Sequence, residues 1–129
     1  MDAIETWHRV VETRDRALLA DLLAPDVIFE SPVVHTPQHG RDIATAYQLG
    51  AMAVLGNDHF RYTGEWRSGS GAVLEFESEI DGIRINGVDI IRCTADGRQI
   101  AEFKVMVRPL KAIDIVHRRM GELLKKAQG

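Results

Sequence analysis

The sequence predicts a single α+β domain, residues 1–129, in which helices pack on one face of a curved antiparallel sheet. Two observations support this fold class. In the first half of the chain, most segments show the apolar spacing of helices, with one short strand among them. In most of the second half, apolar and polar residues alternate, as they do in the strands of a meander. The chain of 129 residues is also long enough for one domain with a buried core.

Four helices are expected from the spacing of apolar residues. The first covers Ala3–Arg14, and Asp15 can cap a second over Arg16–Leu23. A long helix is expected over Asp42–Leu55, and an optional last one over Leu110–Ala127. The apolar face of the long helix is expected to consist of Ile43, Ala44, Tyr47, Ala51 and Val54.

Strands are expected between and after these helices. Val27–Ser31 alternates and ends at Pro32, and Ile83–Asn86 leads into the last hairpin. Phe60–Arg67 and Ala72–Ile80 should form a hairpin of their own. Strict alternation places the following side chains on one face of it: Phe60, Tyr62, Gly64, Trp66, Leu74, Phe76, Ser78 and Ile80. The charged residues of both strands would share the other face.

The last hairpin, formed by Val88–Cys93 and Ile100–Val107, places one carboxylate on an apolar face. A turn centred on Gly97 puts Arg92 across from Glu102 and Asp89 across from Val105. Burial disfavours the charged form of a carboxyl group, so the pKa of Asp89 should be raised. Such an acid can donate a hydrogen bond or act as a general base. Alternatively, Asp89 hydrogen-bonds to backbone or lies near the mouth of the fold.

Composition excludes several classes of function. The net charge is −3 and no basic stripe is present, so we expect no nucleic-acid partner. Apolar runs are too short to span a bilayer, and the charged start MDAIETWHRV lacks a signal region, so we expect a cytoplasmic protein with no membrane partner. Cys93 is the only cysteine, and we interpret it as a small buried apolar residue.

The loop Val33–Gly40 contains two histidines, His35 and His39, separated by Pro37. The proline makes helical spacing of the pair improbable, and no acid or cysteine nearby completes a ligand set. We therefore expect neither a metal nor an organic cofactor. His35 is a candidate catalytic residue at the mouth of a pocket, although a solvated histidine is the simpler interpretation.

Two segments resemble the nuclear transport factor 2-like superfamily, and within it the SnoaL-like and ketosteroid isomerase-like groups. One is Phe29–Val33 followed by Pro37 and Gly40; the other is Val88–Arg92 followed by Gly97. The resemblance covers nearly the whole chain and implies one SnoaL-like domain. It also implies a cystatin-like, cone-shaped half-barrel whose curved sheet, mixed or antiparallel, encloses a pocket, with helices on its concave face. Such proteins are commonly dimers through the outer face of the sheet.

The resemblance carries only part of the chemistry. Asp89 matches the aspartic acid that donates a hydrogen bond in the oxyanion hole of ketosteroid isomerases. Ser31 falls where those enzymes carry an aspartate base, and Trp7 falls near their oxyanion-hole tyrosine. Phe103 and Val105 occupy positions where many SnoaL-like proteins have a histidine and an aspartate. Neither complete catalytic set is present.

Three functions remain open. The first is an acid–base enzyme, such as an isomerase, dehydratase or cyclase, acting on a small hydrophobic molecule through Asp89 and His35. The others are non-catalytic ligand binding and a dimeric interaction domain. A homodimer is expected through the outer face, where Val88, Ile90 and Met106 lie among charges. The residues expected to contact the ligand are Trp7, Phe29, Ser31, Tyr47, Phe76, Ile91, Phe103 and Val105.

Overall fold

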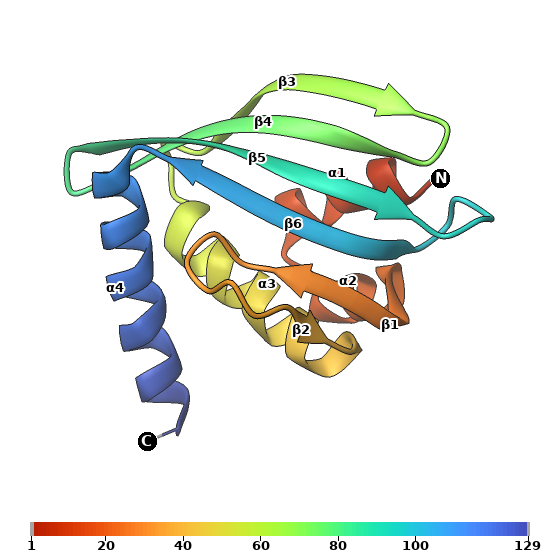
Figure 1. The fold of residues 1–129 in the computed structure, drawn as a ribbon, viewed down its shortest axis with the longest axis horizontal. Helices are drawn as coiled ribbons and strands as arrows, with labels where there is room; N and C mark the ends of the chain where they lie inside the picture. The colour runs from red at the N-terminus through yellow and green to blue at the C-terminus, as the bar shows by residue number, and fades with distance from the viewer. Residues whose placement is uncertain (1, 129) are drawn as a thin grey trace.

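The computed structural model describes residues 2–128 and confirms the α+β class (Figure 1). Its strands form one sheet in the order β2-β1-β6-β5-β4-β3. In chain order the elements are α1 (Ala3–Thr13), α2 (Arg16–Leu22), β1 (Leu23–Glu30), β2 (Gln38–His39), α3 (Arg41–Leu55), β3 (Arg61–Ser68), β4 (Gly71–Ile80), β5 (Ile83–Cys93), β6 (Ile100–Arg108) and α4 (Leu110–Gln128).

The sheet is mixed and does not close into a barrel. Strand β1 runs parallel to β6, whereas the other neighbouring strands are antiparallel. The expected fold class allowed a mixed or an antiparallel sheet, and the parallel β1–β6 pair makes the sheet mixed. Strand β1 is far from β6 in the sequence, and the chain between them allows the crossover that parallel pairing requires.

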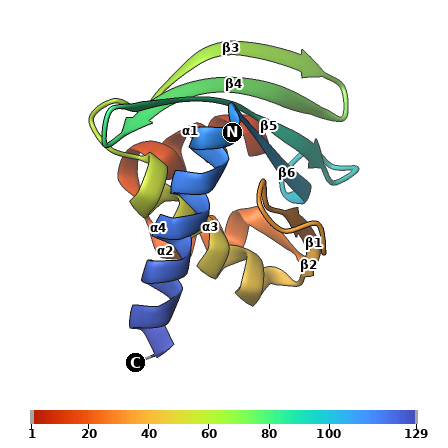
Figure 2. The same ribbon diagram turned by 60° about the vertical axis from the view of Figure 1, so that its left-hand side comes forward.

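The helices lie on the concave side of the sheet, with α3 beneath β1 and α4 descending from one end (Figures 1 and 2). This side contains the core, in which the ring of Trp7 meets Phe103 at a centroid distance of 4.7 Å. Asp15 caps α2 as expected, because its side chain accepts a hydrogen bond from the Leu18 N–H. Among residues 2–128, no helix has the length and apolar character needed to cross a membrane.

The register of the last hairpin is confirmed. Asp89 pairs with Val105, and Arg92 pairs with Glu102, whose carboxylate lies 3.3 Å from the Arg92 Nε. The division of the preceding segment into two strands was wrong, because β5 runs without a break through Gly87. A Cβ atom at Gly87 would lie 2.4 Å from Cζ of Phe76, so only glycine lets this aromatic ring pack against the strand.

A β-bulge changes the faces of the β3–β4 hairpin. Tyr62 pairs with Phe76, but Gly64 pairs with Glu75, so one extra residue lies between them. Trp66 consequently points outward and is 60% exposed. Glu65 turns toward α1, where its carboxylate lies 2.6 Å from His8 Nε2. The prediction that Trp66 shares a face with Tyr62 was wrong for this reason.

Some further expectations also fail. Ile43 is 45% exposed, and the buried face of α3 includes Thr45 and Gln48. Because apolar residues occur nearly all round this helix, their spacing does not define one buried face. Strand β1 begins directly after α2, β2 lies within the predicted loop, and Cys93 is half-buried.

Candidate functional site

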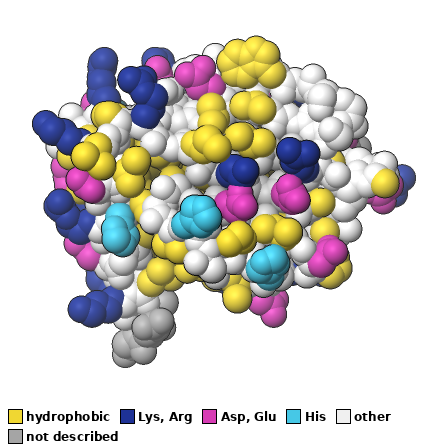
Figure 3. All heavy atoms as spheres, viewed as in Figure 1, with side chains coloured by type: hydrophobic (Ala, Val, Ile, Leu, Met, Phe, Trp, Pro, Cys, Tyr) yellow, Lys and Arg dark blue, Asp and Glu magenta, His cyan; other side chains and the backbone are white. Residues whose placement is uncertain are grey.

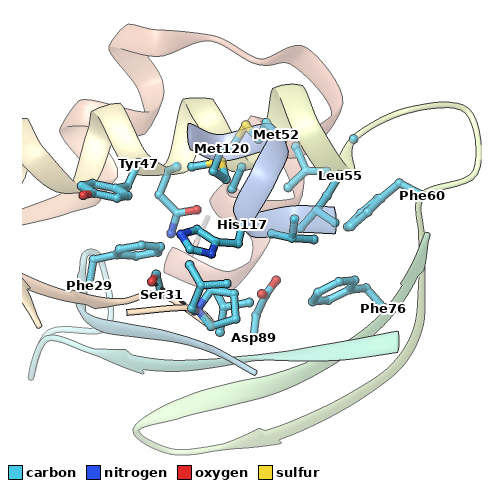
Figure 4. A pocket seen from close by; sticks show the side chains of 18 of the residues that line it. Phe29, Ser31, Tyr47, Met52, Leu55, Phe60, Phe76, Asp89, His117 and Met120 are labelled. Carbon is cyan, nitrogen blue, oxygen red and sulfur yellow. Dashed lines mark hydrogen bonds between the residues drawn. The ribbon is translucent and has the colours of Figure 1, made fainter. Parts of the chain in front are cut away.

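A cavity of about 380 Å³ lies between the sheet and helices α1, α3 and α4 (Figure 4). Its volume is within the range of small-molecule pockets, roughly 300–1,000 Å³. Most of its surface is apolar, and a few polar side chains converge on it. The apolar and aromatic residues that line it include Phe29, Tyr47, Met52, Leu55, Phe60, Phe76, Val105 and Met120.

Asp89 lines this cavity from the middle of β5. The alternation of β5 turns its side chain to the concave face, where only 5% of the residue is exposed. Burial raises the pKa of Asp89 to about 7, and a hydrogen bond from Tyr62 opposes this effect without overcoming it. The predicted burial of Asp89 and the predicted rise of its pKa are therefore both found. Both protonation states of this carboxyl group are populated near neutral pH.

A chain of hydrogen bonds connects Asp89 to α1. The Trp7 indole N–H donates to the Tyr62 hydroxyl oxygen at 2.9 Å, and that hydroxyl donates to Asp89 Oδ2 at 2.6 Å. Burial and the nearby Asp89 carboxylate raise the pKa of Tyr62 well above its usual value. Tyr62 therefore stays protonated and acts as a neutral donor. Oδ1 of Asp89 makes no hydrogen bond to any residue of the described range.

Ser31 lies on the cavity wall just after β1, but its side chain also has a structural task. Its Oγ accepts hydrogen bonds from the backbone N–H groups of Val34, at 3.0 Å, and Val33, at 3.4 Å. These bonds fix the loop that follows β1. The hydroxyl proton of Ser31 remains available to a molecule in the cavity.

Most of the predicted ligand-contacting residues meet at this cavity: Trp7, Phe29, Ser31, Tyr47, Phe76 and Val105 line it with Asp89. Ile91 and Phe103 do not, because they lie further along the hairpin, where α1 covers the sheet and Trp7 packs on Phe103. His35 is exposed and is absent from the lining, so the structure does not bring it to Asp89.

Several lining residues were not identified from the sequence. Tyr62 could have been identified from the sequence, because alternation placed it on the same face as Phe76. Gln48 could not be identified, because the spacing of apolar residues in α3 does not show which face of the helix is buried. His117 and Met120 come from α4, and Figure 4 shows both pointing toward the cavity. Their position depends on how α4 packs across the open end of the sheet, which the pattern of α4 alone does not specify.

Comparisons with known proteins agree with this fold. A family model described as SnoaL-like domain matches residues 4–103. The chain is 33% identical to the crystal structure of a steroid delta-isomerase from Pseudomonas aeruginosa, with a TM-score of 0.91, covering 98% of this chain and 91% of that one.

A second similar structure is an uncharacterized protein with a cystatin-like fold from Silicibacter pomeroyi. It is 29% identical, with a TM-score of 0.87, and the match covers 95% of this chain and 85% of that one. A search of curated proteins gave no match. The family match spans most of the residues that form the sheet and the Asp89 site, and the chain therefore belongs to the SnoaL-like domain family.

Proposed function

We propose that this protein binds a small, largely apolar molecule in the cavity and acts on it by acid–base chemistry through Asp89. One observation carries the proposal: a buried carboxyl group with a pKa of about 7 opens onto an apolar cavity. A general acid–base group is most effective when its pKa lies near the working pH. The similarity to a protein named steroid delta-isomerase supports the same class of chemistry.

The hydrogen bonds of Asp89 suggest how the group would act. Tyr62 occupies Oδ2, so Oδ1 is the oxygen that reaches the ligand. In the ionised form Oδ1 takes a proton from the ligand, for example from a carbon next to a carbonyl group. In the protonated form Asp89 returns this proton to another position. Tyr62 stabilises the ionised form without adding a positive charge.

His117 is the residue we assign as a second proton-transfer group. His117 is exposed, as His35 is, but unlike His35 it lines the cavity, and in Figure 4 it faces the same space as Asp89. Its imidazole ring can donate a hydrogen bond to a ligand or accept one from it. It takes the place that the sequence hypothesis gave to His35, which lies outside the cavity.

Ligand binding without turnover is a second candidate function. Ser31 stands where related isomerases carry their base, and its oxygen is already engaged by the loop. Val105, directly across from Asp89, supplies no second acid–base group on the sheet. In this case Asp89 would only hold the ligand by a hydrogen bond.

We further propose that two copies associate through the outer face of the sheet. An outer apolar strip runs across four strands and consists of Trp66, Val73, Val88, Ile90 and Met106. Trp66 is 60% exposed and Met106 is 50% exposed. Exposing such large apolar side chains to water is unfavourable, and a partner covering them would remove this cost. On the face of the molecule drawn in Figure 3, hydrophobic side chains gather between acidic and basic ones.

Proton exchange in deuterium oxide tests the enzymatic proposal. The protein is incubated with 2-tetralone and related bicyclic ketones, and deuterium incorporation next to the carbonyl is followed by NMR. We expect exchange above the protein-free rate, and a decrease of roughly 10²–10⁴-fold in Asp89→Asn. Asp114→Asn, an exposed change on α4 away from the cavity, should leave the rate unchanged. Binding without exchange would favour the second function, and absence of both would contradict the proposal.

A further inference from the structure

The side-chain amide of Gln48 is a buried polar group without a partner. Gln48 lies on α3, is only 2% exposed, and lines the cavity that contains Asp89. Its Nε2 makes no hydrogen bond to any residue of the described range. More than nine in ten buried polar groups in folded proteins are paired, because an unpaired donor keeps the full cost of losing water.

Thr45, about one turn earlier on the same helix, provides a comparison for Gln48. Its Oγ1 is also buried and unpaired among the described residues, but Thr45 does not line the cavity. An unpaired atom on α3 is therefore not by itself a sign of a ligand. Gln48 differs because the residue lines a space that a ligand can enter, so a bound molecule can supply the missing partner of its amide.

We propose that Gln48 is a second polar anchor, whose Nε2 donates a hydrogen bond to a neutral oxygen acceptor of the bound molecule. This inference rests on the proposed ligand-binding function. The two anchors enter from different walls, Asp89 from β5 and Gln48 from α3, which lies beneath the sheet in Figure 2. The rest of the lining includes apolar and aromatic side chains such as Phe29, Tyr47 and Met52.

The chemistry of the anchors defines a substrate class. A neutral amide does not compensate a charged group, so the group at Gln48 is a carbonyl or ether oxygen rather than a carboxylate. The group at Asp89 is a hydroxyl or carbonyl that exchanges a proton or a hydrogen bond with Oδ1. The ligand is therefore an apolar skeleton with two separated oxygen functions, and a pure hydrocarbon or a singly oxygenated analogue should bind less tightly.

Two naphthols of the same shape test this inference. 6-Acetyl-2-naphthol carries a carbonyl at the end opposite its hydroxyl, and 6-isopropenyl-2-naphthol has a methylene group in place of that oxygen. Titrations followed by fluorescence should show about tenfold tighter binding of the acetyl compound to the wild type, which corresponds to one buried hydrogen bond. In Gln48→Met and Gln48→Leu the two compounds should bind equally.

Two controls separate this role from a structural one. Thr45→Val should keep the tenfold preference, because Thr45 does not border the cavity. The melting temperature of unliganded Gln48→Met should equal or exceed that of the wild type, because the change removes an unpaired buried donor. A Gln48 that merely stabilised the fold would give a lower melting temperature instead.

The outcomes also separate this inference from the proposed function. If Val105→Trp, which should fill the cavity, weakens both naphthols but the wild type shows no preference between them, or both Gln48 variants keep the preference, the Gln48 anchor is wrong and the cavity stands as the ligand site. If neither naphthol binds to the wild type, or Val105→Trp binds both as well as the wild type does, the proposed ligand-binding function fails and the anchor with it.

Discussion

The Tyr62 hydroxyl donates a hydrogen bond of 2.6 Å to Asp89 Oδ2, although the two residues are 27 positions apart and their strands are separated by β4. This donor is neutral, so it orients the carboxyl group without cancelling its charge. The electrostatic cost of burial therefore dominates, and the pKa of Asp89 rises to about 7. A cation in the same place would have kept this carboxyl group ionised.

Tyr62→Phe should raise the pKa of Asp89 further, because the hydrogen bond that favours the ionised form is lost. It should also lower the free energy of unfolding by about 1–2 kcal/mol, since the Trp7 indole N–H loses its acceptor. NMR titration and urea denaturation measure the two effects. Tyr47→Phe, which removes a hydroxyl from the α3 wall of the same cavity, is the matched control and should leave the pKa of Asp89 unchanged. An unchanged pKa in Tyr62→Phe would contradict this account of the site.

Asp89→Asn should be as stable as the wild type or more stable at pH 7.5. Between the unfolded pKa of about 3.8 and the folded pKa of about 7, the folded state keeps a proton that the unfolded state has released. The wild type therefore loses stability as the pH rises through this window, by about 4 kcal/mol over some three pKa units. Asparagine does not titrate, so the variant should lack this loss.

Urea denaturation of both proteins at pH 4 and at pH 7.5 measures this difference. The stability of Asp89→Asn relative to the wild type should increase from the lower to the higher pH. A variant that is clearly destabilised at pH 7.5 would instead identify Asp89 as an ionised structural anchor.

Val105→Trp should abolish ligand binding and leave the fold nearly intact. Val105 lies across from Asp89 on the cavity wall, and a larger side chain there can occupy existing empty space. Titration with 6-acetyl-2-naphthol and thermal unfolding measure the two properties. Val105→Ala, which enlarges the cavity, is the control and should still bind. Unchanged binding by Val105→Trp, or its unfolding, would tell against a pocket at this place.

Met106→Glu should convert the proposed homodimer into a monomer, because it places a charge in the outer apolar strip. Sedimentation at micromolar concentration should give twice the chain mass of 14.4 kDa for the wild type and 14.4 kDa for the variant. Leu110→Glu is the matched control, since Leu110 is 72% exposed on α4 and outside the strip. A monomeric wild type would exclude this interface under these conditions.

The parts of the site that could be predicted depend on local pairing. The position of Asp89 opposite Val105 follows from one turn and strict alternation, which a hairpin imposes over a short stretch of chain. Trp66 could not be placed, because the bulge after Tyr62 reverses the faces and leaves no sign in the alternation itself.

The helical part of the site could not be predicted for a different reason. Gln48 and His117 reach the cavity because α3 and α4 pack against the sheet and each other. Such contacts depend on the tertiary arrangement and not on the spacing within either helix. The sequence therefore identified the acid on the sheet, and the structure was needed to find the side chains that face it.

The titration of the Asp89 side-chain carboxyl carbon, followed by NMR in protein labelled with ¹³C at aspartate and assigned with Asp89→Asn, tests the central claim most directly. We predict a midpoint at a pH of about 7, because burial without a cationic partner favours the protonated form. A midpoint at or below pH 4 would contradict the claim, since Asp89 would then be permanently ionised at neutral pH and unable to exchange a proton with a bound molecule.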